Sequence, residues 1–372
     1  MSKILPFKTI RSEPLISPLE ISRLFPVTIT QNHFIAQSRR QIIRILDGID
    51  KRHLLILGPC SIHDDKAAIH YAKKLKELIS EVSDVFFPIM RFYFEKPRTG
   101  LGWKGLVNDP HLDGSLDLNW GLKLTRKLLV QLAEMEVPAA AEILDPISGH
   151  YFGELLSWGC IGARTSSSQV HRQIASGLPM PVGFKNTIEG NIEIPIHAIL
   201  SAAEPHSYIG LNEMGVASII HTGGNPHCHL VLRGSEKASN FDKDSVREII
   251  GKLEKLKLSP KLLIDCSHDN SRKDHTKQPE VFENVMEQIL NGNTAIRGLI
   301  LESHLRAGRQ EVASNLSLLK YAISITDSCI DWETTEGIIL SAREALLAKT
   351  FSLSSQNRQI GETAEPQEFA QV

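Results

Sequence analysis

Short apolar runs alternate with helical patterns along most of this chain, and this alternation constrains the fold more than any other feature. The first run, residues 53–57 (HLLIL), is ended by Gly58 and Pro59, as expected where a buried strand stops. Apolar residues then recur at spacings of three and four from Ala68 to Ile79, which predicts a helix. A strand followed by a helix is the unit from which parallel sheets are built.

Seven further runs have strand character. They are residues 85–94 (VFFPIMRFYF), 138–144 (PAAAEIL), 160–164 (CIGAR), 181–186 (PVGFKN), 229–234 (HLVLRG), 261–265 (KLLID) and 296–301 (IRGLIL). Helices are predicted between them, for example at 122–135, at 246–256 and at 279–290, where a proline opens the pattern. Eight strands in about 250 residues are the number of a (β/α)8 TIM barrel. A doubly wound open sheet is the alternative.

Two segments depart from the simple alternation. The runs 208–211 and 217–221 predict a small β-hairpin inserted before the sixth strand. Residues 95–118 form a long connection rich in glycine, proline and basic residues, which is typical of a functional loop.

The chain therefore divides into three predicted parts. Residues 1–50 mix prolines with a helical stretch at 32–46, and we expect an N-terminal extension that serves as an oligomer or regulatory arm. Residues 51–350 form the catalytic (β/α)8 barrel. Residues 351–372 are polar and are expected to form a mobile C-terminal tail.

Charge and composition exclude several classes of protein. The net charge of −2 gives no general attraction for nucleic acid or an anionic membrane, so any anionic ligand needs a local cluster of cations. No window approaches the ~20 apolar residues of a membrane span, and the N-terminus lacks the apolar core of a signal peptide. Five widely spaced cysteines argue against a disulfide framework and for a reducing cytoplasm.

A polar side chain lies at or just beyond the C-terminal end of every predicted strand. In chain order they are Cys60, Arg91, Glu142, Arg164, Lys185, Arg233, Asp265 with His268, and Glu302 with His304. In a barrel these ends meet at one rim, where TIM-barrel enzymes place their active sites. The pattern alone therefore predicts a site at this rim.

Six of the rim residues and their near neighbours are cations. They are Arg91, Lys96, Arg98, Arg164, Lys185 and Arg233. Arginine presents a rigid fork of donors that suits phosphate and carboxylate oxygens. Because burying six cations without anions is prohibitive, we expect the site to receive one or two polyanions.

A second set offers sulfur, imidazole and carboxylate, the usual ligands of a divalent transition metal. It consists of Cys60, His268, Glu302 and Asp327. A hydrolase built on cysteine and histidine is the alternative, but that mechanism gives no reason for six cations. If Asp327 binds metal, Cys329 lies close to Cys60, and oxidation of the metal-free protein is expected to join the two sulfurs.

Several motifs, in order, resemble class I 3-deoxy-D-arabino-heptulosonate 7-phosphate (DAHP) synthases of the microbial subgroup with an N-terminal extension and an inserted hairpin. They are 58–64 (GPCSIHD), 90–99 (MRFYFEKPRT), 102–105 (GWKG), 162–165 (GART), 181–186 (PVGFKN), 229–234 (HLVLRG), 264–268 (IDCSH), 301–304 (LESH) and 324–327 (SITD). The resemblance runs from about residue 15 to 350 and implies a TIM-barrel transferase. It would condense phosphoenolpyruvate with erythrose 4-phosphate, releasing phosphate, in the first step of the shikimate pathway.

The resemblance also implies residue roles. One divalent ion (Mn, Fe, Co or Zn) would be bound by Cys60, His268, Glu302 and Asp327. The phosphoenolpyruvate phosphate would be held by Arg164, Arg233, Lys185 and the backbone N–H of Ala163, and its carboxylate by Arg91 and Lys185. Glu142 would lie near the water that attacks C2. Erythrose 4-phosphate would be held by Lys96, Arg98 and Thr99, with Lys96 as the expected proton donor and His268 as the second candidate.

Two other functions stay open at this stage. The sibling synthase that uses arabinose 5-phosphate shares the barrel, although residues 96–99 (KPRT) match the erythrose 4-phosphate version. An inactive regulatory paralogue is the third possibility. The resemblance implies a homodimer or homotetramer and an aromatic amino acid effector. Three segments, residues 145–150, 177–180 and 208–212, depart from the phenylalanine-sensitive pattern. The identity of the effector is therefore left open.

Overall fold

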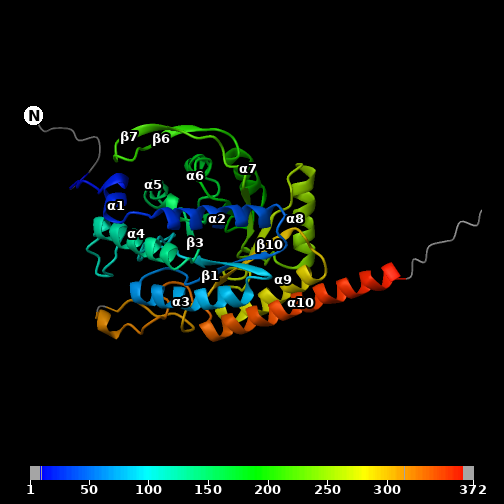
Figure 1. The fold of residues 1–372 in the computed structure, drawn as a ribbon. Helices are drawn as coiled ribbons and strands as arrows, with labels where there is room; N and C mark the ends of the chain where they lie inside the picture. Colours follow the sequence, from blue (N-terminus) through cyan, green and yellow to red (C-terminus); the bar gives the residue numbers. More distant parts are fainter. Residues whose placement is uncertain (1–8, 10, 314, 363–372) are drawn as a thin grey trace, which may run out of the picture.

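Eight parallel strands close into a barrel around which the helices are arranged (Figure 1). This computed structural model describes residue 9, residues 11–313 and residues 315–362, with side chains as far as residue 352. The strand order around the barrel is β1-β10-β9-β8-β5-β4-β3-β2. The strands are β1 (His53–Gly58), β2 (Phe86–Arg91), β3 (Ala139–Glu142), β4 (Trp158–Ile161), β5 (Val182–Lys185), β8 (Cys228–Leu232), β9 (Leu262–Asp265) and β10 (Ile296–Glu302). Because β1 pairs with both β2 and β10, the barrel sheet has no free edge, which confirms the TIM barrel over the open sheet.

The helices that connect the strands begin where the sequence supplies caps. Asp64 accepts a hydrogen bond from the backbone N–H of Ala67 and opens the helix predicted around Ala68. The α-helices are α1 (Pro18–Leu24), α2 (Ile29–Leu46), α3 (Asp65–Val82), α4 (Leu118–Glu134), α5 (Ser148–Phe152), α6 (Gln169–Ala175), α7 (Glu193–Ala202), α8 (Lys243–Lys255), α9 (Gln278–Leu290) and α10 (Trp332–Glu362). Short 3-10 helices lie at η1 (Gly153–Leu155), η2 (His275–Lys277) and η3 (Leu316–Leu318).

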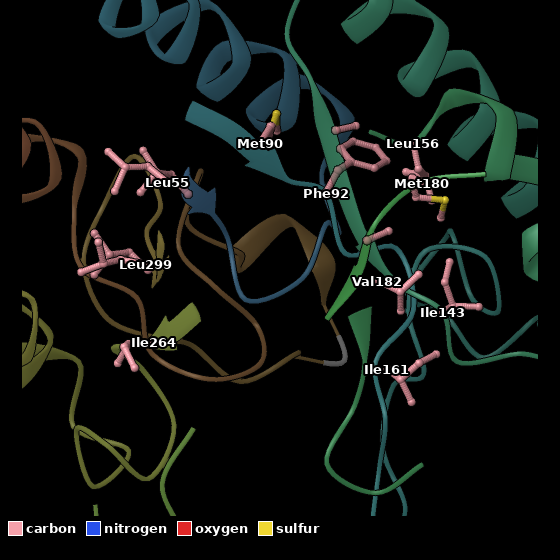
Figure 2. Close-up of a cluster of buried hydrophobic side chains, with 14 of the residues drawn as sticks. Leu55, Met90, Phe92, Ile143, Leu156, Ile161, Met180, Val182, Ile264 and Leu299 are labelled. Atoms are coloured by element: carbon pink, nitrogen blue, oxygen red, sulfur yellow. The ribbon is translucent and has the colours of Figure 1, made fainter. Parts of the chain in front are cut away.

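Alternation along the strands divides the core into two layers. Leu54 and Ile56 of β1 belong to a cluster inside the barrel, together with Trp158 and Cys160 of β4. Leu55, Ile264 and Leu299 point outward from the barrel and belong to a second cluster (Figure 2). This cluster also contains helix residues such as Leu75 of α3. Successive side chains of a strand point to opposite faces of the sheet. Because one face is covered by the inside of the barrel and the other by helices, both sets are apolar and the strand is a continuous apolar run in the sequence.

The N-terminal segment closes one end of the barrel. Helix α2 adds Ile42, Ile45 and Leu46 to the inner cluster. Its end is tied to the start of β9 by an ion pair of 2.5 Å between Lys261 Nζ and Asp47 Oδ1. The end where the strands begin is therefore plugged, and the opposite end is left for the site.

The predicted hairpin insertion is present as an antiparallel pair, β6 (Ser207–Leu211) and β7 (Ala217–His221). It lies apart from the barrel sheet and above α5 and α6 in the view of Figure 1. The backbone N–H of Leu19 in α1 donates to the carbonyl of Glu213 between the two strands at 2.8 Å. The hairpin and the N-terminal segment are thus in contact within one chain.

Several predicted boundaries differ from the structure by a few residues, most clearly those of the fourth strand and of the tail. The fourth strand was predicted at 160–164 but is β4 (Trp158–Ile161), because the chain turns at Gly162, whose carbonyl accepts the N–H of Thr165 at 3.0 Å. A Cβ at Gly162 would lie 2.1 Å from Glu142 Oε1, so a side chain has no room there. The predicted tail starts inside α10, and residues 363–372, like residues 1–8 and 10 of the extension, lie outside the described part.

Candidate active site

A cavity of about 330 Å³ opens at the end of the barrel where the strands finish. Its wall contains the predicted site residues Arg91, Lys96, Arg98, Thr99, Glu142, Ala163, Arg164, Lys185, Arg233, His268, Glu302 and Asp327. Of the side chains predicted at the strand ends, Cys60, Asp265 and His304 do not line it, because all three are buried behind the wall. The other strand-end residues share one cavity.

Three of the expected metal ligands meet at one corner of this cavity. The ligand atoms of Cys60, Glu302 and Asp327 all lie within 4.8 Å of one another. Gly58 and Pro59 end β1 directly before the sulfur, and Glu302 is the last residue of the neighbouring strand β10. A thiol beside two carboxylates is a donor set that suits a divalent transition metal.

The ammonium of Lys96 lies in the same corner. Its Nζ is 2.7 Å from Cys60 Sγ and 2.8 Å from Asp327 Oδ2. Burial opposes the charged form of Lys96, but the adjacent Cys60 sulfur and the carboxylates of Asp327 and Glu302 outweigh it and raise the pKa of Lys96. Burial raises the pKa of Cys60 to about 12, with Glu302 adding to the effect. A cation thus already occupies the position next to the sulfur and the carboxylate.

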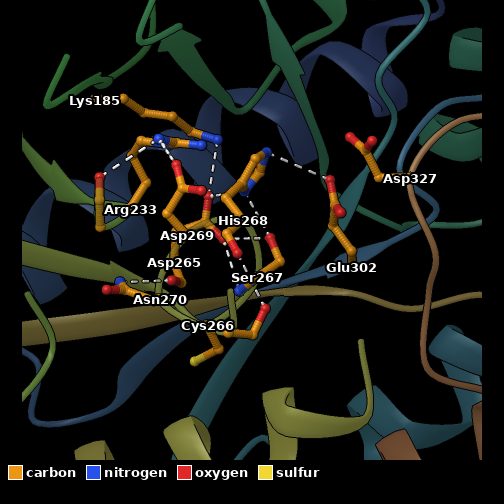
Figure 3. A network of polar contacts seen from close by, with 12 residues as sticks. Lys185, Arg233, Asp265, Cys266, Ser267, His268, Asp269, Asn270, Glu302 and Asp327 are labelled. Carbon is orange, nitrogen blue, oxygen red and sulfur yellow. Dashed lines mark hydrogen bonds and ion pairs between the residues drawn. The ribbon is translucent and has the colours of Figure 1, made fainter. Parts of the chain in front are cut away.

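His268 is held from one side so that its other nitrogen faces Glu302 (Figure 3). Its Nδ1 lies 2.9 Å from Asp265 Oδ2 and 2.7 Å from Ser267 Oγ, and its Nε2 lies 3.7 Å from Glu302 Oε1. Burial opposes ionisation of Asp265, but its contacts with the His268 ring and the Lys185 ammonium hold its pKa well below the usual range. An ionised carboxylate at Nδ1 fixes the proton there and leaves Nε2 as an acceptor, the arrangement found behind metal-binding histidines.

Most of the six cations carry a carboxylate partner from the protein itself. Arg91 Nη2 is 2.9 Å from Glu302 Oε1, and Lys185 Nζ is 2.9 Å from Asp265 Oδ2. Arg233 pairs with Asp269 in the same buried way. The argument that these cations need bound polyanions left out the counter-charges that β9, β10 and the loop after β9 supply.

Arg98 and Arg164 differ from the other four cations. Within the described residues neither has an ion pair with a carboxylate. Arg98 Nε donates to the carbonyl of Trp103, and Arg164 Nε donates to Thr99 Oγ1 at 2.9 Å. Both side chains line the open cavity, so their guanidinium groups are available to an anion.

Glu142 has a buried carboxylate oxygen that no described residue satisfies with a hydrogen bond. It ends β3 on the cavity wall and is largely buried. Its Oε1 has no hydrogen-bond partner in the structure. A buried carboxylate oxygen without a partner is costly, and in a cavity of this size a substrate or water group can satisfy it.

Sequence reasoning missed several residues of the site. Asp269 pairs with Arg233, and the side-chain amide of Gln278 bonds both the N–H and the carbonyl of Glu302. Lys273 and His275 also line the cavity. Asp269 immediately follows His268 in the sequence. Its position just beyond a predicted strand could therefore have identified it as a site residue. Gln278 gave no signal beyond its position at the start of α9.

A barrel of this kind, with a cavity lined by charged side chains at the carboxyl ends of its strands, has the site of a TIM-barrel enzyme. A sequence model described as the DAHP synthetase I family matches residues 25–339. The tyrosine-sensitive phospho-2-dehydro-3-deoxyheptonate aldolase of Salmonella typhimurium is 48% identical over 325 residues, which are 87% of this chain and 91% of that protein. The tryptophan-sensitive enzyme of Escherichia coli is 45% identical, over 89% of this chain and 95% of its own.

A solved structure of phospho-2-dehydro-3-deoxyheptonate aldolase from Francisella tularensis matches with a TM-score of 0.89 and 43% identity, over 92% of this chain and 99% of that one. This chain belongs to the DAHP synthetase I family. Its function is DAHP synthesis from phosphoenolpyruvate and erythrose 4-phosphate, the first step of aromatic amino acid biosynthesis, as the resemblance implied. Among the described helices, none combines the length and the apolar character needed to cross a membrane.

Proposed function

We propose that the cavity binds phosphoenolpyruvate on one side and erythrose 4-phosphate on the other. The observation that carries this proposal is that all six expected cations line one cavity. The phosphate of phosphoenolpyruvate is assigned to Arg164, Arg233, Lys185 and the backbone N–H of Ala163, and its carboxylate to Arg91 and Lys185. Erythrose 4-phosphate is assigned to Lys96, Arg98 and Thr99.

The hydrogen bond between Arg164 and Thr99 supports this division. It joins a residue assigned to one substrate to a residue assigned to the other. Two dianionic phosphates repel each other in solution, and cations on a shared wall offset that repulsion while fixing the distance between the reacting carbons. Orientation is thus the main contribution expected from this set of side chains.

The proposed metal site consists of Cys60, His268, Glu302 and Asp327. Cys60, Glu302 and Asp327 fit a divalent ion, since their sulfur and oxygen ligand atoms lie within 4.8 Å of one another, and two of them already contact the Lys96 ammonium. His268 is assigned as the nitrogen ligand because its Nε2 lies 3.7 Å from Glu302 Oε1. An ion bound there would supply Lewis-acid polarisation of the aldehyde.

The protein's own groups then divide the proton transfers. Glu142, with its unpartnered Oε1, is placed to orient the water that attacks C2 of phosphoenolpyruvate. Lys96 is assigned as the donor to the oxygen that becomes an alkoxide when the new carbon–carbon bond forms, because its ammonium lies beside Cys60 and Asp327, at the proposed metal corner. Asp265 keeps Lys185 charged, because the two form a buried ion pair.

The decisive experiment measures phosphate release from phosphoenolpyruvate with erythrose 4-phosphate, with arabinose 5-phosphate and with neither, before and after chelation. We expect release only with erythrose 4-phosphate and only when a divalent metal is restored. Release with arabinose 5-phosphate alone would assign the chain to the sibling reaction. Release that ignores the aldose and the chelator would overturn the proposal.

Feedback control and assembly form a second part of the proposal. We propose an aromatic amino acid effector near the hairpin, where α1, α5 and β6–β7 meet. Tyr151 Oη donates to the carbonyl of Ile16, and the N–H of Leu19 donates to the carbonyl of Glu213. Names of relatives include both tyrosine- and tryptophan-sensitive enzymes. Separate inhibition assays with Phe, Tyr and Trp identify the effector, and light scattering distinguishes the expected dimer or tetramer from a monomer.

A cytoplasmic location is the last part of the proposal. All five cysteines are free and buried, which accords with a reducing compartment. Fractionation of cells that express the tagged chain tests this location, and recovery in a membrane or secreted fraction would contradict it.

A further inference from the structure

The loop after β9 contributes a cation to which the assignments above give no role. Lys273 lines the cavity, and its side chain is 63% exposed. Its Nζ lies 3.5 Å from Asp269 Oδ1, while Asp269 Oδ2 pairs with Arg233. One buried carboxylate therefore stands between two cations on the same wall.

Beside Arg164, which is assigned to the same phosphate, a further cation at this wall offsets the negative charge of Asp269. Arg233 and Asp269 together are neutral, so a dianion that approaches Arg233 also meets the negative charge of Asp269. Lys273 makes the group of three positive. A distance of 3.5 Å to an oxygen exceeds the usual range for N–H···O hydrogen bonds, so Lys273 is only loosely attached to Asp269.

Asp269 is fixed, which leaves Lys273 as the group that can move. The backbone N–H of Asp269 donates to the carbonyl of Arg233 at 3.2 Å, in addition to the side-chain pair. A Cβ at Gly234 would lie 2.7 Å from the carbonyl carbon of Asp269, so the two backbones are in close contact. The long side chain of Lys273 has no comparable restraint in the described contacts.

The backbone of the loop holds Lys273 at the cavity by an uncommon conformation. Three non-glycine residues, His268, Arg272 and Lys273, have φ of +56°, +54° and +59°. The N–H of Lys273 donates to the carbonyl of His268 at 2.6 Å, which closes the turn. Left-handed conformations of this kind cost free energy, and they persist where the surroundings enforce them, often at functional sites.

We propose that Lys273 is a further phosphate-binding residue, whose ammonium leaves Asp269 and closes on the phosphate held by Arg233. This inference rests on the proposed function, under which that phosphate belongs to phosphoenolpyruvate. Lys273 then contributes to the affinity for phosphoenolpyruvate and leaves the chemical step to the residues assigned above.

The test compares Lys273→Met with Arg272→Met in the full-length, metal-loaded enzyme. Arg272 is a matched control, because it is the adjacent exposed cation, has the same backbone conformation and does not line the cavity. For Lys273→Met we expect the Kd and the KM for phosphoenolpyruvate to rise roughly tenfold, which is about 1.4 kcal/mol. The kcat and the KM for erythrose 4-phosphate stay at the wild-type values. Arg272→Met leaves all of these unchanged, and Lys273→Arg recovers most of the affinity.

Calorimetric titration with phosphoenolpyruvate alone, and with inorganic phosphate alone, measures binding at this subsite without turnover. A lower Tm for Lys273→Met with unchanged affinity for both probes would overturn the inference and assign Lys273 to structure. A rise confined to the KM for erythrose 4-phosphate would overturn it as well. A wild-type enzyme that makes no DAHP contradicts the proposed function instead, and the titration with inorganic phosphate still decides the role of Lys273.

Discussion

Glu95 provides a test of the electrostatics next to the substrate loop. This residue immediately precedes Lys96, and its side chain is only 2% exposed. Its carboxylate oxygens accept long hydrogen bonds from the backbone N–H groups of Leu144 and Asp145, at 3.4 and 3.3 Å. Burial raises the pKa of Glu95 to about 8, and the charge of Asp145 adds to the shift.

The raised pKa makes stability fall as the pH rises. Below the ordinary value of 4.5 both the folded and the unfolded states hold the proton. Between 4.5 and about 8 only the folded state keeps it, so the free energy of unfolding decreases through this window and levels off above it. The whole shift corresponds to roughly 4–5 kcal/mol as an upper limit, because each unit of pKa is worth about 1.36 kcal/mol.

Glu95→Gln removes the titration while keeping an acceptor oxygen of the same shape. We expect wild type and variant to have similar free energies of unfolding near pH 5, and the variant to be more stable by at least ~1 kcal/mol near pH 8.5. Urea titrations at several pH values measure the difference, in which contributions from other titrating groups cancel. The exposed Glu280→Gln is the control for loss of one charge. A difference that stays constant with pH, or that favours wild type at high pH, would refute the reasoning.

Four further outcomes are expected. Cys60→Ala should abolish metal-dependent turnover and lower the metal stoichiometry measured by calorimetric titration. The circular dichroism spectrum should stay unchanged. Full activity of this variant would show that Cys60 is not a metal ligand. Lys96→Met should lower kcat more than the affinity for phosphoenolpyruvate, as steady-state kinetics at saturation will show, and unchanged turnover would exclude it as the proton donor. The N–H of Cys60 lies 3.3 Å from Cys329 Sγ, so oxidation of the chelated protein should remove two thiols in a thiol titration, whereas two free thiols would contradict the pairing. Gly105→Ala should lower the Tm measured by calorimetry by several degrees. The φ of Gly105 is +119°, and the new Cβ would lie 2.3 Å from the carbonyl oxygen of Phe94. An unchanged Tm would mean that the loop relaxes.

The strand ends illustrate how far local reasoning reaches. Cys60, Lys185 and Glu302 were predicted at one rim because each follows or ends an apolar run, and all parallel strands of a barrel finish on the same side. The fourth strand shows the limit. Its run was placed too far along, since the chain leaves the strand in the turn at Gly162, which the apolar pattern does not mark.

The partners of the cations could not be predicted in the same way. Asp265 was recognised as a strand-end residue, yet its pairing with Lys185 joins positions far apart in the chain. Lys96 was predicted to contact erythrose 4-phosphate, and no local pattern indicated that its ammonium also lies between Cys60 and Asp327. Such contacts depend on angles and distances between elements that no local pattern encodes.

The sequence by itself determined the number of strands, the barrel they form, the rim on which the polar residues gather and the family to which the chain belongs. These features follow from periodicity and from short motifs, which are local properties of the chain. The tertiary structure alone decided which carboxylate neutralises which cation, that Cys60 is buried behind the wall and that Lys273 reaches the cavity. Electrostatic interactions fall off with distance and change with burial, so charge pairing is defined only when the barrel has closed.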